Sequence, residues 1–258
     1  MKAILLCAGY ATRLYPLTQD HPKPLLPVGG KPILEWILEA LKVSKEPFEA
    51  VYIVTNSTFF PHFEKWARDY PKSPWPVEIV NDGTTSNENR LGAIGDLAFT
   101  LKQKKIGAED LFVAAGDNFF DFPLREFFQT ARSKHPHPAI AVYDVGDPEL
   151  ARHYGIVRLD RDARVCEFLE KPENPPTTLA SCGLYWMPAA SRLLLDSYIA
   201  SGHNSDQPGH YMRWLSEQGP LFAVSLRGQW LDIGDKDSYQ KADKLFRATP
   251  HHPERKKK

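Results

Sequence analysis

The sequence is short of cysteine, of net charge and of long apolar runs, and each shortage excludes a class of protein. Its three cysteines, Cys7, Cys166 and Cys182, form no CxxC pair, so we expect reduced thiols that fill space in a cytoplasmic protein. Lysine plus arginine and aspartate plus glutamate each number 32, and this balance creates no long-range field toward nucleic acid or anionic lipid. No apolar stretch approaches the roughly 20 residues that cross a bilayer. A strand-like segment follows Met1 almost at once, so no signal peptide is expected.

The first half of the chain alternates strand-like and helix-like segments. With 258 residues, 42% of them hydrophobic, the chain can bury one full core. Short apolar runs predict buried parallel strands, and apolar residues at helical spacing predict crossover helices between them. The expected strands are 2–8, 50–55, 77–81 and 110–115, and the expected helices are 33–42, 61–70 and 91–104.

From residue 139 onward, strand-like segments follow one another with shorter links, which predicts that the sheet becomes mixed. We expect strands at 139–145, 154–160, 165–171, 183–187 and 221–226, and helices at 189–200, 211–217 and 236–247. No internal repeat or proline-rich linker divides the chain. Residues 1–248 are therefore predicted to form one α/β domain, and the charged, proline-broken tail 249–258 is expected to be disordered.

The first apolar strand ends in small residues and is followed by two cations. Residues 6–13 are LCAGYATR, and Pro22-Lys23-Pro24 comes shortly afterwards. Small residues let backbone N–H groups approach an anion, and Arg13 and Lys23 supply positive charge where a triphosphate would lie. A dinucleotide GxGxxG and the Gly-Lys-Ser/Thr of a P-loop are both missing from this segment. For Gly9 taken alone, an ordinary βα turn is the alternative.

The stretch from Leu6 to Pro32 closely resembles the signature of the sugar-1-phosphate nucleotidylyltransferases, or NDP-sugar pyrophosphorylases. That pattern is Gly-x-Gly-Thr-Arg followed by Pro-Lys-Pro, and Ala11 stands where the second glycine is usual. If the loop requires a positive φ there, Ala11 costs roughly 1 kcal/mol. The resemblance implies a Rossmann-like α/β fold with a mixed, mainly parallel sheet. It also implies nucleotide contacts from Leu6, Ala8, Gly9, Tyr10, Ala11, Thr12, Arg13 and Lys23.

Two carboxylates are candidate magnesium ligands. Asp117 follows the apolar run LFVAAG, which would place it at the carboxyl edge of a parallel sheet, where ligands bind; a turn with Asn118 or a helix cap is an equal alternative. Asp232 lies in a segment similar to the family's Trp-x-Asp-x-Gly motif, whose aspartate joins the earlier one in holding Mg²⁺. Two carboxylates with substrate phosphates and water suit Mg²⁺. The nine histidines show no HExxH or Cys/His spacing, so zinc is not supported.

Glu170-Lys171-Pro172 matches the family's Glu-Lys-Pro motif. The resemblance implies that Lys171 holds the sugar phosphate and that Glu170 accepts hydrogen bonds from sugar hydroxyls, while a surface loop after a strand is the alternative. Tyr154-Gly155 and Gly183 lie in segments that resemble those whose glycines let the backbone contact the sugar. Ser181-Cys182-Gly183 departs from the more common Asn-Ala-Gly, so the identity of the sugar stays open.

The segment 81–97 stands where the family selects its nucleobase. Gly92 matches the glycine of a Gln-x(4)-Gly pattern, and Asn87 replaces the glutamine. An amide can pair with a base edge, but asparagine is shorter. Arg90 is a further candidate, with a solvated loop arginine as the alternative. The choice among CTP, UTP, dTTP, GTP and ATP stays open.

Together the motifs resemble those of the family closely, and the resemblance implies Mg²⁺-dependent joining of a nucleoside triphosphate to a sugar 1-phosphate, with Arg13, Lys23 and Lys171 as the catalytic cations and Asp117 also in contact with the nucleotide. One alternative keeps the chemistry but uses phosphocholine or inositol phosphate. Another is a non-catalytic regulatory subunit that binds an NDP-sugar. We expect no nucleic-acid or membrane partner, and a homo-oligomer stays open. No β-helix repeat follows Lys236, so a fused acyltransferase is not expected.

Overall fold

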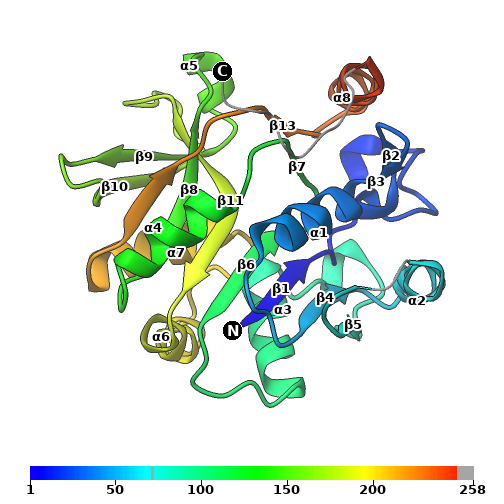
Figure 1. Ribbon diagram of the computed structural model, residues 1–258, viewed down its shortest axis with the longest axis horizontal. Helices are drawn as coiled ribbons and strands as arrows, with labels where there is room; N and C mark the ends of the chain where they lie inside the picture. The colour runs from blue at the N-terminus through cyan, green and yellow to red at the C-terminus, as the bar shows by residue number, and fades with distance from the viewer. Residues whose placement is uncertain (71–72, 249–258) are drawn as a thin grey trace.

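The computed structural model describes residues 1–70 and 73–248, which form a mixed sheet with helices on both faces (Figure 1). Nine strands of these ranges make the main sheet, in the order β10-β9-β11-β6-β1-β4-β5, with β8 beside β11 and β12 beside β8. The α/β fold class predicted from the sequence is confirmed. The bounds are β1 (Lys2–Leu6), β4 (Val51–Thr55), β5 (Val77–Asn81), β6 (Leu111–Ala115), β8 (Ala139–Asp144), β9 (Gly155–Leu159), β10 (Val165–Glu170), β11 (Leu179–Met187) and β12 (Phe222–Ser225).

The N-terminal half of the sheet is parallel. Strand β1 pairs with β4 and β6, and β4 pairs with β5, all in the parallel sense that the strand–helix alternation predicts. The expectation of burial is wrong for β5, in which only Val80 is buried. The reason is its position, because β5 is the edge of the sheet and has no neighbour on its outer side.

The C-terminal half is mixed, as its shorter links predict. Strand β11 runs antiparallel to β6, β8 and β9, β10 runs antiparallel to β9, and β12 is parallel to β8. Cys166 faces solvent on β10, so the prediction that it fills space is wrong, whereas Cys7 and Cys182 are buried. All three cysteines are free thiols.

Alternate side chains of β1 belong to different cores, which places helices on both faces of the sheet. Ala3 and Leu5 pack in one cluster with residues of α1, α2 and α4, and Ile4 packs in another with residues of α3, α6 and α7. A third, smaller core joins α8 to the segment before α1. The bounds are α1 (Ile33–Ser44), α2 (Phe60–Asp69), α3 (Ala93–Gln103), α4 (Arg125–Ser133), α5 (Pro148–Ala151), α6 (Ala189–Ala200), α7 (Pro208–Gln218) and α8 (Lys236–Ala248).

The sequence analysis missed several short elements. Helix α4 buries Phe127, Phe128 and Ala131, and strands β7 (Asn118–Phe120) and β13 (Trp230–Asp232) form a separate antiparallel pair. That pair sets Asp232 opposite Asn118, beside Asp117, and so joins two motifs that are far apart in the chain. The remaining elements are β2 (Pro27–Val28), β3 (Lys31–Pro32) and the 3₁₀ turns η1 (Thr12–Leu14), η2 (Lys23–Leu25) and η3 (Asn87–Asn89).

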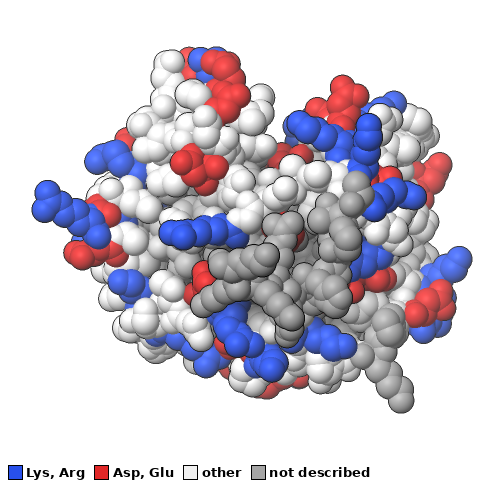
Figure 2. Space-filling view, turned by 45° about the horizontal axis from the view of Figure 1, so that its top comes forward, with Lys and Arg blue, Asp and Glu red and all other residues white. Residues whose placement is uncertain are grey.

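Charges of both signs are interspersed over the face of the molecule in Figure 2, in keeping with the zero net charge. None of the helices in residues 1–70 and 73–248 has the length and apolarity needed to cross a membrane. The tail 249–258, expected to be disordered, lies outside the described residues.

Candidate active site

A cavity of about 310 Å³ opens where β1 and β6 end. Its walls include Leu6 and Ala115, the last residues of these parallel strands, so it lies at the sheet edge where α/β proteins bind ligands. Thr12, expected to contact the nucleotide, is exposed in η1 and does not line it. The other expected nucleotide contacts all line it: Leu6, Ala8, Gly9, Tyr10, Ala11, Arg13, Lys23, Asn87, Arg90, Gly92 and Asp117.

The loop after β1 has the shape that the glycine-rich signature requires. Ala11 has φ 47° and ψ 44°, so the left-handed conformation anticipated from the sequence is present. Because alanine has a Cβ, this conformation is strained. Thr18 holds this strained residue by donating its hydroxyl to the Ala11 carbonyl at 2.8 Å. At Gly9, no neighbouring atom lies within 4 Å of the place of a Cβ, so its bare backbone leaves the cavity open.

Asn56, which the sequence analysis did not single out, anchors the same loop. Its buried side chain donates to the Ala8 carbonyl at 2.9 Å and accepts from the backbone N–H of Phe59 at 2.9 Å. These two bonds join the loop after β1 to the start of α2. The loop that faces the cavity is therefore held by Asn56 as well as by its own residue Thr18.

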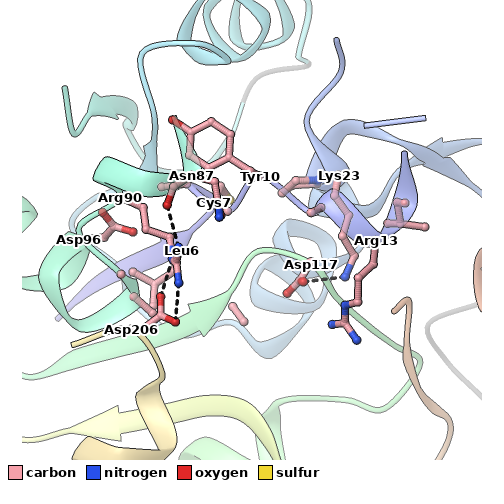
Figure 3. Close-up of a pocket in the computed structure, with 18 of the residues that line it drawn as sticks. Leu6, Cys7, Tyr10, Arg13, Lys23, Asn87, Arg90, Asp96, Asp117 and Asp206 are labelled. Atoms are coloured by element: carbon pink, nitrogen blue, oxygen red, sulfur yellow. Dashed lines mark hydrogen bonds and ion pairs between the residues drawn. The ribbon is translucent and has the colours of Figure 1, made fainter. Parts of the chain in front are cut away.

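Lys23 and Asp117 form an ion pair at one end of the cavity (Figure 3). Lys23 is buried, and its Nζ lies 2.7 Å from Oδ2 of Asp117. Burial opposes ionisation of Asp117, but the charge and hydrogen bond of Lys23 prevail and lower the pKa of this carboxyl below its ordinary value. Arg13 reaches the same end and adds a second positive charge.

Asp232 stands beside this pair. Burial raises the pKa of Asp232 above its ordinary value, and the charge of Asp117 adds to the effect while Lys23 and Arg13 oppose it. A Cβ on Gly234 would lie 3.7 Å from Oδ2 of Asp232 and 3.8 Å from a guanidinium nitrogen of Arg13. The Trp-x-Asp-x-Gly segment thus places its aspartate and its glycine at the cationic end.

These two carboxylates fit a magnesium ion completed by substrate. No group of three or more His, Cys, Asp or Glu side chains suited to a metal occurs in residues 1–70 and 73–248. Mg²⁺ is commonly held by one or two carboxylates together with phosphate oxygens and water. Burial is the main cause of the raised pKa of Asp232, and a cation near both carboxylates would offset the smaller contribution from the charge of Asp117.

The expected sugar-phosphate residues lie outside the cavity lining, around the adjoining strand ends. Glu170 faces Gly155 in the β9–β10 pair, and the backbone N–H of Lys171 donates to the Tyr154 carbonyl at 3.0 Å. The ring of Tyr154 lies 4.9 Å from that of Trp230, and burial, with the charge of Asp232 next, raises the pKa of Tyr154 to about 12. The Tyr154 hydroxyl is therefore close enough to Asp232 to be affected by its charge.

Glu170 occupies a cradle that two glycines leave open. A Cβ on Gly209 would lie 1.8 Å from its Oε2, and one on Gly155 would lie 2.9 Å from the same atom. Gln207, with its amide oriented to satisfy both partners, donates to Oε1 of Glu170 at 3.0 Å and accepts from Nζ of Lys171 at 3.2 Å. Burial raises the pKa of Glu170.

Gly183 supports the ends of β6 and β7 instead of lining the cavity. Its φ is +67°, and a Cβ there would lie 3.1 Å from Nδ2 of Asn118, which donates to the Gly183 carbonyl at 3.2 Å. Asn118 also accepts from the indole N–H of Trp230 at 3.0 Å. A single hydrogen bond, from Asn118, thus connects Gly183 to the β7–β13 pair that positions Asp232.

The opposite end of the cavity is closed by the residues before α7 (Figure 3). Arg90 donates to both carboxylate oxygens of Asp206, at 2.8 and 3.0 Å, and to the Asn87 carbonyl at 2.7 Å. Gly92 has φ +78°, and a Cβ there would lie 2.5 Å from Cα of Asp206. The backbone N–H groups of Ala93 and Ile94 donate to carbonyls at 206 and 205. Arg90 is therefore an exposed loop arginine that braces Asn87 against Asp206, and its contact with a nucleotide stays a prediction.

The fold and the site together define an α/β protein with a nucleotide-sized pocket and facing cations and carboxylates at one end. A model of the nucleotidyl transferase family matches residues 2–248, and the chain belongs to that family. The fold and the resemblance inferred from the sequence are thereby confirmed.

Named relatives are similar over most of this chain. The bifunctional protein GlmU of Methanococcus maripaludis is 32% identical over 237 residues, covering 91% of this chain and 51% of the relative. The UTP–glucose-1-phosphate uridylyltransferase of Synechocystis is 30% identical over 249 residues, covering 94% and 62%. The chain thus spans about half the length of the GlmU relatives that it matches.

Solved structures show the same fold at lower identity. A Bacillus anthracis protein described as a glucose-1-phosphate thymidylyltransferase superposes with a TM-score of 0.80 at 22% identity, over 98% of this chain and 97% of that one. A UDP-glucose pyrophosphorylase gives 0.78 at 21% identity, over 95% and 97%. The whole described chain therefore corresponds to one such unit.

Proposed function

We propose that the chain transfers a nucleotidyl group from a nucleoside triphosphate to a sugar 1-phosphate, giving an NDP-sugar and pyrophosphate. The observation that carries the proposal is that Arg13, Lys23 and Asp117 line one end of a single cavity, with Asp232 beside them just outside its lining. Two anionic substrates can come together only where cations and metal-binding carboxylates offset their charge. The name of the uridylyltransferase relative supports this reaction class.

In this reaction a phosphate oxygen of the sugar phosphate attacks the α-phosphorus of the triphosphate, and the bond to the leaving pyrophosphate breaks. Lys171 holds the attacking phosphate, Lys23 contacts the α-phosphate, and Arg13 stabilises the charge on pyrophosphate. The protein supplies orientation and charge, and no side chain forms a covalent bond. Bound Mg²⁺ would neutralise phosphate charge, and Asp117 and Asp232 are the residues that would hold it.

The ion pair in the free protein prepares Lys23 for this role. Its ammonium is buried, and Asp117 neutralises it at 2.7 Å until an α-phosphate competes for the same group. A buried ammonium without a partner would be costly, so the pair keeps the cation in place between turnovers.

Pyrophosphate release with Mg²⁺ tests the proposal across five nucleoside triphosphates and a panel of sugar 1-phosphates, with phosphocholine and inositol phosphate added. Release that needs one triphosphate and a sugar phosphate supports it, and Lys23→Ala should abolish that release. Lys104→Ala, which removes a surface ion pair with Glu78, is the matched control.

Two outcomes contradict the proposal. Release only with phosphocholine or inositol phosphate identifies the non-sugar acceptor. No release at all, from folded protein that still binds an NDP-sugar, identifies a regulatory subunit.

A further inference from the structure

Carboxyl groups that the proposed reaction does not use lie at the end of the cavity lined by Asn87, Arg90 and Gly92, which we call the base end. Asp96 lies on the buried face of α3, lines the cavity and is 6% exposed. Asp82, just after β5, lies behind the lining and is 7% exposed, and Asp206 completes a group of three acids from three separate segments. Among residues 1–70 and 73–248, a cation pairs with only one of the three, Asp206, because Arg90 binds both of its oxygens.

Asp96 keeps a proton that it can donate to its neighbour Asp82. Oδ1 of Asp82 accepts from the backbone N–H of Thr84 at 2.6 Å and from its hydroxyl at 2.8 Å. Within the described residues no donor reaches Oδ2 of Asp82 or Oδ1 of Asp96, both of which are buried. Burial, then the charge and hydrogen bond of Asp82, and then Asp206 raise the pKa of Asp96 to about 8. One proton between two buried carboxyls removes their repulsion.

This arrangement leaves an acceptor on the cavity side. Oδ1 is the buried oxygen of Asp96 and the residue lines the cavity, so Oδ2 is the oxygen available to a ligand. The nearby guanidinium of Arg90 is already occupied by Asp206 and by the Asn87 carbonyl. A base that enters this end therefore meets an acceptor without a donor, and it lowers its free energy most by providing an N–H group.

We propose that Asp96 determines base specificity by accepting a hydrogen bond from the exocyclic amino group of the nucleobase, so that the site prefers ATP, CTP or GTP to UTP and dTTP. The proposal rests on the proposed function. Uracil and thymine carry no amino group, and the carbonyls that flank their N3–H would face carboxyl lone pairs. A carboxyl pair that only braces α3 against β5 would affect all bases equally.

The test is calorimetric binding of the five triphosphates with Mg²⁺ to the wild-type protein and to two variants. Asp96→Leu keeps the size of the side chain and removes the acceptor, and the preference for an amino-bearing base over UTP should fall about tenfold. Asp96→Asn can donate to Asp82 while its carbonyl oxygen faces the cavity, so it should keep the preference. Asp69→Asn, an exposed acid at the end of α2, is the matched control.

Three results would overturn the proposal: a wild-type preference for UTP or dTTP, an unchanged preference in Asp96→Leu, or an equal loss for all five nucleotides. Comparing GTP with ITP, which lacks the 2-amino group, isolates the amino group if guanine is preferred. Failure here is separable from failure of the proposed function. Pyrophosphate release without an amino-base preference removes only the role of Asp96, whereas base-selective binding without release removes only the reaction.

Discussion

The two ends of the cavity are both charged, but they reach neutrality in different ways. At the end of the cavity that contains Arg13 and Lys23, which we call the phosphate end, Lys23 pairs with Asp117, and Arg13 lies near Asp232. At the base end, Arg90 neutralises Asp206 while Asp96 keeps a proton beside Asp82. Cations opposite carboxylates can exchange partners when phosphate or metal arrives, whereas a carboxyl that keeps its proton fixes a pattern of donors and acceptors. The first arrangement suits catalysis and the second suits selection.

The largest effect should come from the phosphate end. We expect Arg13→Ala to lower turnover by about 10²-fold or more, because one preorganised charge donor at a developing charge contributes that much. Pyrophosphate release at saturating substrates measures it, and Arg158→Ala, which removes an exposed pair with Glu167, is the control. Near-normal turnover without Arg13 would break the assignment of this end to the leaving group.

Next comes the metal. We expect Asp232→Asn to raise the Mg²⁺ concentration needed for half-maximal activity by about tenfold, as changes close to a metal commonly do. The Mg²⁺ dependence of nucleotide binding should shift in parallel. Asp235→Asn, a change at a residue that accepts from the backbone N–H of Ser238 at 2.8 Å, should leave the Mg²⁺ dependence unchanged. Equal dependence in Asp232→Asn and wild type would remove Asp232 from the metal site.

The proton on Asp96 should make the free energy of unfolding depend on pH. The pKa of Asp96 is about 8 in the folded chain and 3.8 as its ordinary value, so ionisation costs stability as pH rises between these values. Asp96→Asn removes that cost, and its stability relative to wild type should grow by about 1.4 kcal/mol per pH unit between about pH 5 and 8. Urea unfolding at three pH values measures the slope. A difference that does not vary with pH would show that the pKa of Asp96 is not raised in the folded chain.

The smallest effect should come from the loop after β1. Ala11→Gly relieves the left-handed strain but adds freedom to the unfolded chain, so we expect a net gain of about 0.5 kcal/mol. For a chain of this size, that is about 1–2 °C in melting temperature. Thermal unfolding decides between a gain and a loss, and a loss would mean that the methyl group of Ala11 packs more favourably than its backbone strain costs.

The sequence predicted the residues of the phosphate end because they lie in short motifs that follow the order of the family signature. Arg13, Lys23 and Asp117 sit in short motifs with defined spacing, and the glycine normally at position 11 announced a positive φ that the structure contains. The meeting of Asp117 with Asp232 was predicted only by the family resemblance. No local pattern indicates it, because it depends on strands of three residues that pair across more than 100 positions. Such strands are too short to give a periodic signal.

The base end was largely hidden. Asp96 left one clue, an acid on the otherwise apolar face of a predicted helix. Asp206 left none, because its partner Arg90 lies 116 residues away. The pKa of Asp96 depends on burial by neighbours from three segments, and no local pattern carries that information.

Residues 205–209 have a consequence for engineering this protein. This segment bonds to the start of α3 on one side and holds Glu170 and Lys171 on the other. A chimaera with a breakpoint between Gly92 and Ser205 would take Gly92 and the backbone of Asp206, which it contacts closely, from different parents. Selectivity for base and for acceptor therefore cannot be recombined as independent modules, and a successful graft must transfer this segment together with the base loop.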